Sequence, residues 1–87
     1  MIIGEAMNTY NIVLHTIKEK EYQIKLELND DETEIISWVA VKNAVVVSAS
    51  NPLSLLALII IAETYGDQWR SVEIENLYDK ILEQNVL

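Results

Sequence analysis

The chain lacks cysteine, and its 87 residues include only two glycines, one proline and one histidine. Without cysteine there is no disulfide framework, no thiolate metal site and no cysteine nucleophile. His15 has no nucleophile or second metal ligand at a suitable spacing, and the two glycines form no phosphate-binding loop. Ser48, Ser50 and Ser54 belong to no G-x-S-x-G or S-x-x-K motif. We therefore predict a protein that is not an enzyme and that uses no cofactor and no metal.

Long apolar runs and basic leader segments are also absent. No apolar stretch approaches the roughly 20 residues that are needed to span a bilayer, and no basic segment precedes an apolar one at the N-terminus. We expect a cytoplasmic protein without membrane contact, in the host cytoplasm if a phage encodes it. Residues 1–7 carry no pattern, so they are expected to form a flexible leader or to precede an alternative start at Met7.

Positive charge is scarce, because six Lys and Arg residues stand against fourteen Asp and Glu residues, which gives a net charge of −8. This charge repels nucleic-acid phosphates and anionic membranes, so direct nucleic-acid binding is not expected. The same charge attracts basic protein surfaces, including surfaces that hold DNA. An alternative is that the acids only keep an apolar chain soluble, since 51% of the residues are hydrophobic.

The hydrophobic periodicity predicts a single α+β domain over residues 1–87. Its expected order is one helix, a three-stranded antiparallel sheet in a meander, and two helices. Asn51 and Pro52 are typical of a helix start, and Gly66 of a helix end. The expected helices run from Asn8 or Thr9 to about Lys20, from Pro52 to about Tyr65, and onward from a Ser71 cap; the expected strands are Tyr22–Leu28, Thr33–Val41 and Ala44–Ala49, with Lys42 and Asn43 in the last turn.

The middle helix is apolar nearly all the way round, which indicates burial on more than one side. A domain this small offers few elements to cover it, so we expect either a helix sandwiched within one monomer or a homodimer contact. For the homodimer alternative, the expected self-association residues are Leu55, Leu58 and Ile59.

Acidic residues gather in two places that can bind a partner. Five acids lie between Glu27 and Glu34 around the first hairpin turn, without the spacing of a calcium-binding loop. The last helix is expected to add an acidic ridge that includes Glu73 and Glu75. Carboxylates spaced on a rigid scaffold can occupy a groove built for phosphates, because Arg and Lys pair with either group. The predicted contact residues of the hairpin are Asp30, Asp31, Glu32 and Glu34.

The chain contains the segment IKEKEYQIKL, from Ile17 to Leu26, then VSASN, followed by a final acidic helix that contains LYDKI. These segments and the order of the elements resemble a family of small phage anti-CRISPR proteins. The resemblance implies the same αβββαα fold and inhibition of the type II-A CRISPR effector nuclease by acidic DNA mimicry in its PAM-reading cleft. By position it implies contacts from Glu21, Glu73 and Glu75. The chain departs from the family at the Lys42, Asn43 turn, where the family has an acidic loop.

These observations leave three hypotheses for the function. The first is a small acidic inhibitor that binds a basic nucleic-acid-handling protein, such as a CRISPR nuclease. The second is a homo-oligomeric structural or accessory protein that assembles through the middle helix. The third is an immunity protein or antitoxin that neutralises a basic toxin, which shares the physics of the first hypothesis and differs in its target.

Overall fold

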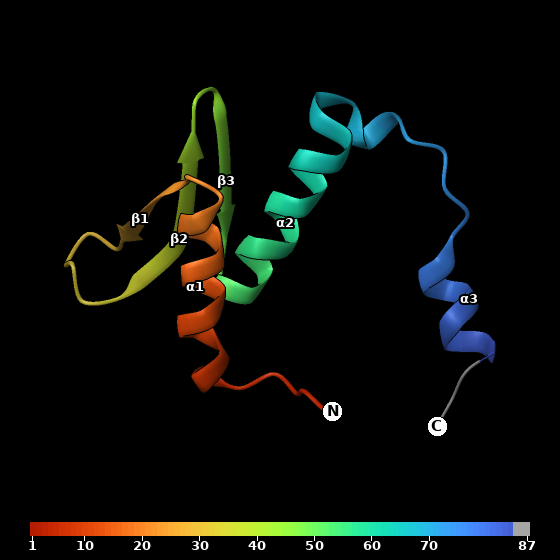
Figure 1. Ribbon diagram of the computed structural model, residues 1–87, viewed down its shortest axis with the longest axis horizontal. Helices are drawn as coiled ribbons and strands as arrows, with labels where there is room; N and C mark the ends of the chain where they lie inside the picture. The colour runs from red at the N-terminus through yellow and green to blue at the C-terminus, as the bar shows by residue number, and fades with distance from the viewer. Residues whose placement is uncertain (85–87) are drawn as a thin grey trace.

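The structure is a computed structural model that describes residues 1–84 and has the predicted α+β order (Figure 1). A short 3-10 turn, η1, precedes the first helix, and a second one, η2, follows the middle helix. The elements are η1 (Met7–Thr9), α1 (Tyr10–Glu19), β1 (Gln23–Leu28), β2 (Ile35–Lys42), β3 (Val45–Ala49), α2 (Pro52–Tyr65), η2 (Gly66–Ser71) and α3 (Leu77–Gln84).

The three strands form an antiparallel meander in the order β1-β2-β3, as predicted. Ile24, Ala40 and Val47 are aligned across the sheet, so their side chains share the face on which α1 and α2 pack. Val46 lies on the opposite face of β3, where it is 67% exposed. Since β3 is an edge strand, one row of its backbone groups has no strand partner in the part of the chain described.

The core lies between this inner face and the two helices α1 and α2. Its fully buried side chains include Ile17 from α1, and Leu55 and Ile59 from the middle helix. Leu55 and Ile59 are four residues apart and thus lie on one face of α2. The middle helix is therefore partly sandwiched within the monomer, against the sheet and α1.

Strand boundaries differ from the prediction by one or two residues. Tyr22 precedes β1 rather than opening it, although its side chain is buried as the alternation predicted. β2 begins at Ile35, not Thr33, because the backbone N–H groups of Thr33 and Glu34 donate to the Asn29 side chain instead of to a strand. The turn before β3 is Asn43 and Ala44 rather than Lys42 and Asn43, with Asn43 at a φ of 53°.

The ends of α2 follow the predicted capping signals. The Asn51 side chain accepts a hydrogen bond of 2.9 Å from the Ser54 N–H, and Pro52 occupies the first turn. Gly66 ends the helix at φ 62° and ψ −149°, a backbone region that is nearly exclusive to glycine. The chain can therefore turn sharply at Gly66 and enter η2.

The last helix was predicted to begin at Ser71, and this prediction is wrong. Residues 72–76 form a connection without regular structure, and α3 begins at Leu77. Asn76, not Ser71, caps α3, since its side-chain oxygen accepts a 3.1 Å hydrogen bond from the Asp79 N–H. Glu73 and Glu75 consequently lie in the connection and form no helical ridge with Asp79 and Glu83.

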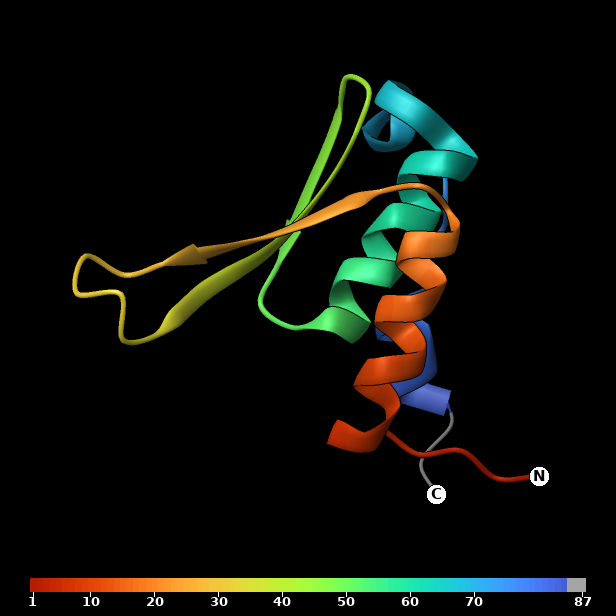
Figure 2. The ribbon, with the colours of Figure 1, turned by 60° about the vertical axis from the view of Figure 1, so that its left-hand side comes forward.

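The β1–β2 hairpin extends beyond the helical layer, and α3 stands apart from it on the other side of the molecule (Figure 1, Figure 2). Because the helices cover only the near half of the hairpin, Leu26 and Leu28 on the far half remain exposed. Every residue of α3 is exposed as well. Within residues 1–84, no helix has both the length and the apolar character needed to cross a membrane.

Candidate functional site

The predicted acidic hairpin turn is a loop closed by one asparagine, and we call residues 29–34 the acidic loop. The Asn29 side-chain oxygen accepts hydrogen bonds from the N–H groups of Thr33 (2.9 Å) and Glu34 (3.2 Å). The Asn29 backbone makes two further hydrogen bonds. Its N–H donates to the Glu34 carbonyl, and its carbonyl accepts from the Glu32 N–H. Asn29 thereby fixes the loop by local hydrogen bonds that replace strand pairing.

The carboxylates of the acidic loop all face solvent. Asp30, Asp31, Glu32 and Glu34 are all exposed, and so is Glu27 on the adjoining strand, whereas Asn29 is partly buried. None of these five acids belongs to an ion pair within residues 1–84. Their charges are therefore available to a basic partner, and their repulsion is balanced only by solvent.

The remaining predicted contact residues do not join this loop. Glu21 lies in the turn between α1 and β1 at a φ of 70°, with its side chain exposed. Glu73 and Glu75 lie in the connection to α3, on the other side of the molecule from the hairpin tip (Figure 1). Glu75 also pairs with Lys80. The structure brings together the hairpin acids and separates them from the other three predicted residues.

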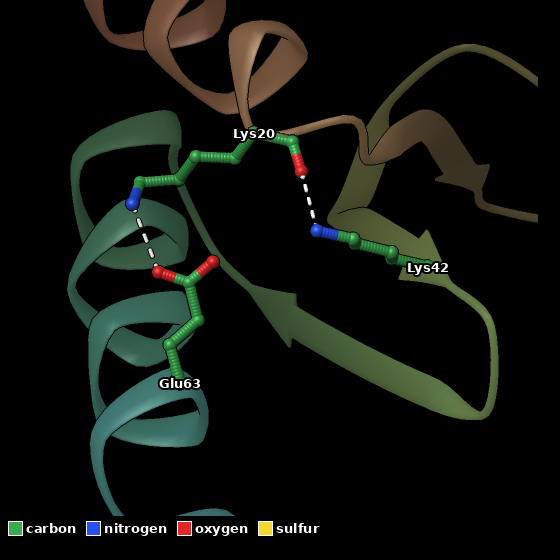
Figure 3. Close-up of polar contacts among 3 residues, drawn as sticks. All are labelled: Lys20, Lys42 and Glu63. Carbon is green, nitrogen blue, oxygen red and sulfur yellow. Dashed lines mark hydrogen bonds and ion pairs between the residues drawn. The ribbon is translucent and has the colours of Figure 1, made fainter.

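A polar cluster of Lys20, Lys42 and Glu63 ties α1, α2 and the sheet together (Figure 3). The Lys20 ammonium donates to Glu63 Oε1 at 2.8 Å, and the Lys42 ammonium donates to the Lys20 carbonyl at 2.9 Å. Lys42 Nζ also lies 5.4 Å from the centre of the Tyr22 ring. Burial, followed by the Glu63 carboxylate, raises the pKa of Tyr22 above its ordinary value. Each charge here has a partner, so the cluster anchors the turn that carries Glu21.

The sequence did not predict an apolar cleft that opens between β3, α2 and η2. It has a volume of about 580 Å³, and its apolar walls include Val45 and Val47 from the strand, Leu58 and Ile61 from the helix, and Trp69 from η2. Its charged residues are Asp67 and Arg70. Arg70 lies over the Trp69 ring, 4.9 Å from its centre. The sequence signal that could have indicated the cleft is the edge strand β3, which carries no charge, followed directly by α2, which is apolar nearly all the way round.

The predicted self-association residues fall on two different faces of α2. Leu55 and Ile59 are fully buried in the monomer core, so they are not accessible to a second copy in this fold. Leu58 is 40% exposed and faces the cleft. The exposed large apolar side chains of α2 that a second copy can contact are Leu58, Ile60, Ile61 and Tyr65.

No group of three or more metal-ligating side chains occurs among residues 1–84. The described surface presents two features that a partner can contact, the carboxylates of the acidic loop and the apolar cleft. Comparison with models of known protein families, with curated proteins and with solved structures finds no match to this chain.

Proposed function

We propose that this protein is a small acidic inhibitor that binds a basic, nucleic-acid-handling protein through the acidic loop. The observation that carries the proposal is the loop itself: the Asn29 hydrogen bonds fix its backbone at the end of a projecting hairpin, and its carboxylates are in no ion pair within residues 1–84. A surface of this kind pairs with the Arg and Lys side chains that otherwise hold phosphates.

The loop's internal bonding supports binding energetically. Binding is weakened by the entropy lost when flexible groups become ordered, and a loop that is already fixed loses less of it. Glu32 has a φ of 57°, so the loop maintains a conformation that non-glycine residues seldom adopt. The net charge of −8 adds long-range attraction, which speeds encounter with a basic surface and weakens as salt increases.

The resemblance to anti-CRISPR proteins suggests the target to test first, a type II-A CRISPR effector nuclease. The segment that carries the resemblance includes Glu21, whose turn is anchored by Lys20 and Lys42. The acidic loop lies outside that segment and supplies an acidic surface of its own. In this proposal the protein competes with DNA for the basic cleft of the nuclease.

The test is DNA cleavage by the nuclease with increasing amounts of this protein, at low and at high salt. The loop variant reverses Asp30, Asp31 and Glu32 to Lys. The matched control reverses three exposed acids elsewhere, Glu5, Glu19 and Glu83. Each reversal adds two charges, so both variants change the net charge from −8 to −2. They therefore share the same loss of overall attraction and differ only in the site that is changed.

The proposal expects the wild-type protein to inhibit cleavage at low salt and to compete with DNA. Charge-assisted hydrogen bonds contribute about 1.5–3 kcal/mol each, so losing three should weaken the loop variant by more than about 100-fold. The control should lose far less. Equal losses in both variants would show that charge alone, not the loop, directs binding. Absence of inhibition and of binding to the nuclease at low salt would refute this target, and failure to bind any basic nucleic-acid-handling protein would refute the function.

A further inference from the structure

Helix α3 presents an apolar face that no element within residues 1–84 covers. Leu77 and Ile81 are four residues apart, and so are Tyr78 and Leu82, so all four side chains lie on one side of the helix. Their exposed fractions run from 48% for Leu77 to 74% for Tyr78. Acidic residues Asp79 and Glu83 occupy the opposite side. The helix is thus amphipathic, as a helix packed against another surface would be.

An eight-residue helix of this kind is not stable alone in water. Isolated helices shorter than roughly 12–15 residues are marginal even in alanine-rich sequences, because nucleation is costly. The Asn76 cap and the pairing of Glu75 with Lys80 support only the first turns of α3. The helical conformation of residues 77–84 therefore requires a docking surface for its apolar face.

The cleft between β3, α2 and η2 has the character that this face needs. Its apolar walls include Val45, Val47, Leu58, Ile61 and Trp69, and Trp69 is half-exposed. The segment from Ala44 to Arg70, which forms the whole cleft, contains only three charged residues, and Glu63 among them is paired with Lys20. In a chain of net charge −8, this is the surface on which an approaching second copy meets the least repulsion.

The connection directs α3 away from the cleft of its own chain. Figure 1 shows α2 between the sheet and α3, so α3 lies on the side of α2 that faces away from β3. η2 forms one wall of the cleft, and only the five residues of Val72–Asn76 link it to α3. Fully extended, five residues span at most about 17 Å. In this structure the connection leads away from the cleft, and none of the described residues that line the cleft belongs to α3.

We propose that two copies of this chain associate by exchanging α3, so that the apolar face of each α3 lies in the cleft of the other copy. Exchange of one element between identical chains gives a closed, two-fold assembly in which both apolar surfaces are covered. The cleft carries both Asp67 and Arg70, and in this arrangement the arginine at its rim is the group that can pair with Asp79 or Glu83 of the incoming α3. The association does not depend on the acidic loop, which lies at the far end of the hairpin.

The absence of cysteine allows a direct test by disulfide trapping. One variant carries Ile81→Cys on the apolar face of α3, and another carries Leu58→Cys in the cleft; both positions are partly exposed, so the fold should tolerate the changes. The two full-length variants are mixed in equal amounts and oxidised with glutathione disulfide, which is reduced to two glutathione thiols. Because a disulfide needs Cα atoms within about 7 Å, a bond between the two variants reports α3 in the cleft of another copy. Glu83→Cys, on the acidic side of α3, replaces Ile81→Cys in the control.

The expected result is a mixed disulfide dimer formed at least tenfold faster with Ile81→Cys than with Glu83→Cys. A single chain that carries both Ile81→Cys and Leu58→Cys separates the alternatives. If it closes on itself at a rate independent of concentration, α3 occupies its own cleft and the exchange is refuted. If neither arrangement exceeds the Glu83→Cys control, α3 does not bind the cleft and the proposal is overturned.

Sedimentation of variants without cysteine gives a second measurement. Ile81→Gln and Glu83→Gln introduce the same residue on opposite sides of α3. If α3 is exchanged, Ile81→Gln should raise the dissociation constant of the dimer by at least tenfold. Glu83→Gln, which also removes one negative charge, should not raise it. A strict monomer at high micromolar wild-type protein, or equal behaviour of the two variants, would overturn the proposal.

Discussion

The orientation of α2 determines both the core and the cleft, and two adjacent isoleucines test it. Ile59 is fully buried, whereas Ile60 is 50% exposed. Replacing either one by alanine removes the same three carbon atoms from the same helix. The two variants therefore differ in burial alone, and each serves as the control for the other.

The expected losses follow from transfer and cavity terms. At about 0.8 kcal/mol per buried CH₂, Ile59→Ala loses roughly 2.4 kcal/mol, and the cavity it leaves brings the cost to about 2–5 kcal/mol. Because Ile60 is half-exposed, Ile60→Ala loses only about half of the free energy of transfer from water and leaves no closed cavity. Alanine also has a better helix propensity than isoleucine, which offsets about 0.4 kcal/mol of that loss. The expected cost of Ile60→Ala is below about 1 kcal/mol. Total stability for a chain of this length is about 4–13 kcal/mol, so the first variant would lose a large fraction of it.

The assay is urea unfolding followed by tryptophan fluorescence, since Trp38 packs against the core and reports its loss. The midpoint of Ile59→Ala should fall well below that of Ile60→Ala, with similar slopes m for both. Equal destabilisation would show that α2 is rotated relative to this structure or that another copy buries Ile60. Measurement at two protein concentrations distinguishes these explanations, because only association makes the midpoint depend on concentration.

Three further predictions concern single residues. Gly66→Ala should cost about 1–3 kcal/mol in the same assay, from backbone strain at φ 62° alone, because no atom lies within 4 Å of the added Cβ. Lys20→Met should cost less than about 1 kcal/mol, and less still in high salt, because the Lys20–Glu63 pair is about one-third exposed. Tyr22 has a raised pKa in the folded state, so stability should fall as pH rises above the unfolded pKa of about 10, and Tyr22→Phe should flatten that fall in unfolding curves taken at alkaline pH.

Local sequence signals predicted the elements whose ends are set by a single residue. Asn51, Pro52 and Gly66 bounded the middle helix correctly because capping bonds and a positive φ depend on the residue type itself. The period of two in β1 predicted the inner face of the sheet. The pattern could not show how far the helices extend over that face, since this depends on tertiary packing, and Leu26 and Leu28 are consequently exposed.

The errors occurred where two local signals competed. Ile74 continues the helical spacing of Leu77 and Ile81, so periodicity placed residues 72–76 in the last helix. Ser71 and Asn76 can both cap a helix, and in the structure Asn76 does so. Asn29 had a similar effect in the hairpin, where its side chain binds the N–H groups of Thr33 and Glu34. The acidic loop was predicted from composition, whereas the cleft required the spatial meeting of β3, α2 and η2.

The two proposed surfaces lie far apart, which predicts that each can be removed without loss of the other. The acidic loop ends the projecting hairpin, and the cleft lies beside the opposite edge strand, β3. Ile81→Gln should therefore weaken the dimer at least tenfold while the monomer still inhibits the target with its intrinsic affinity. The triple reversal of Asp30, Asp31 and Glu32 should do the opposite, and sedimentation together with a binding titration measures both.

A dimer would present two acidic loops, so a target immobilised at high density should retain wild-type protein longer than Ile81→Gln. Loss of target binding by the monomer in solution would instead place the binding site across the two copies.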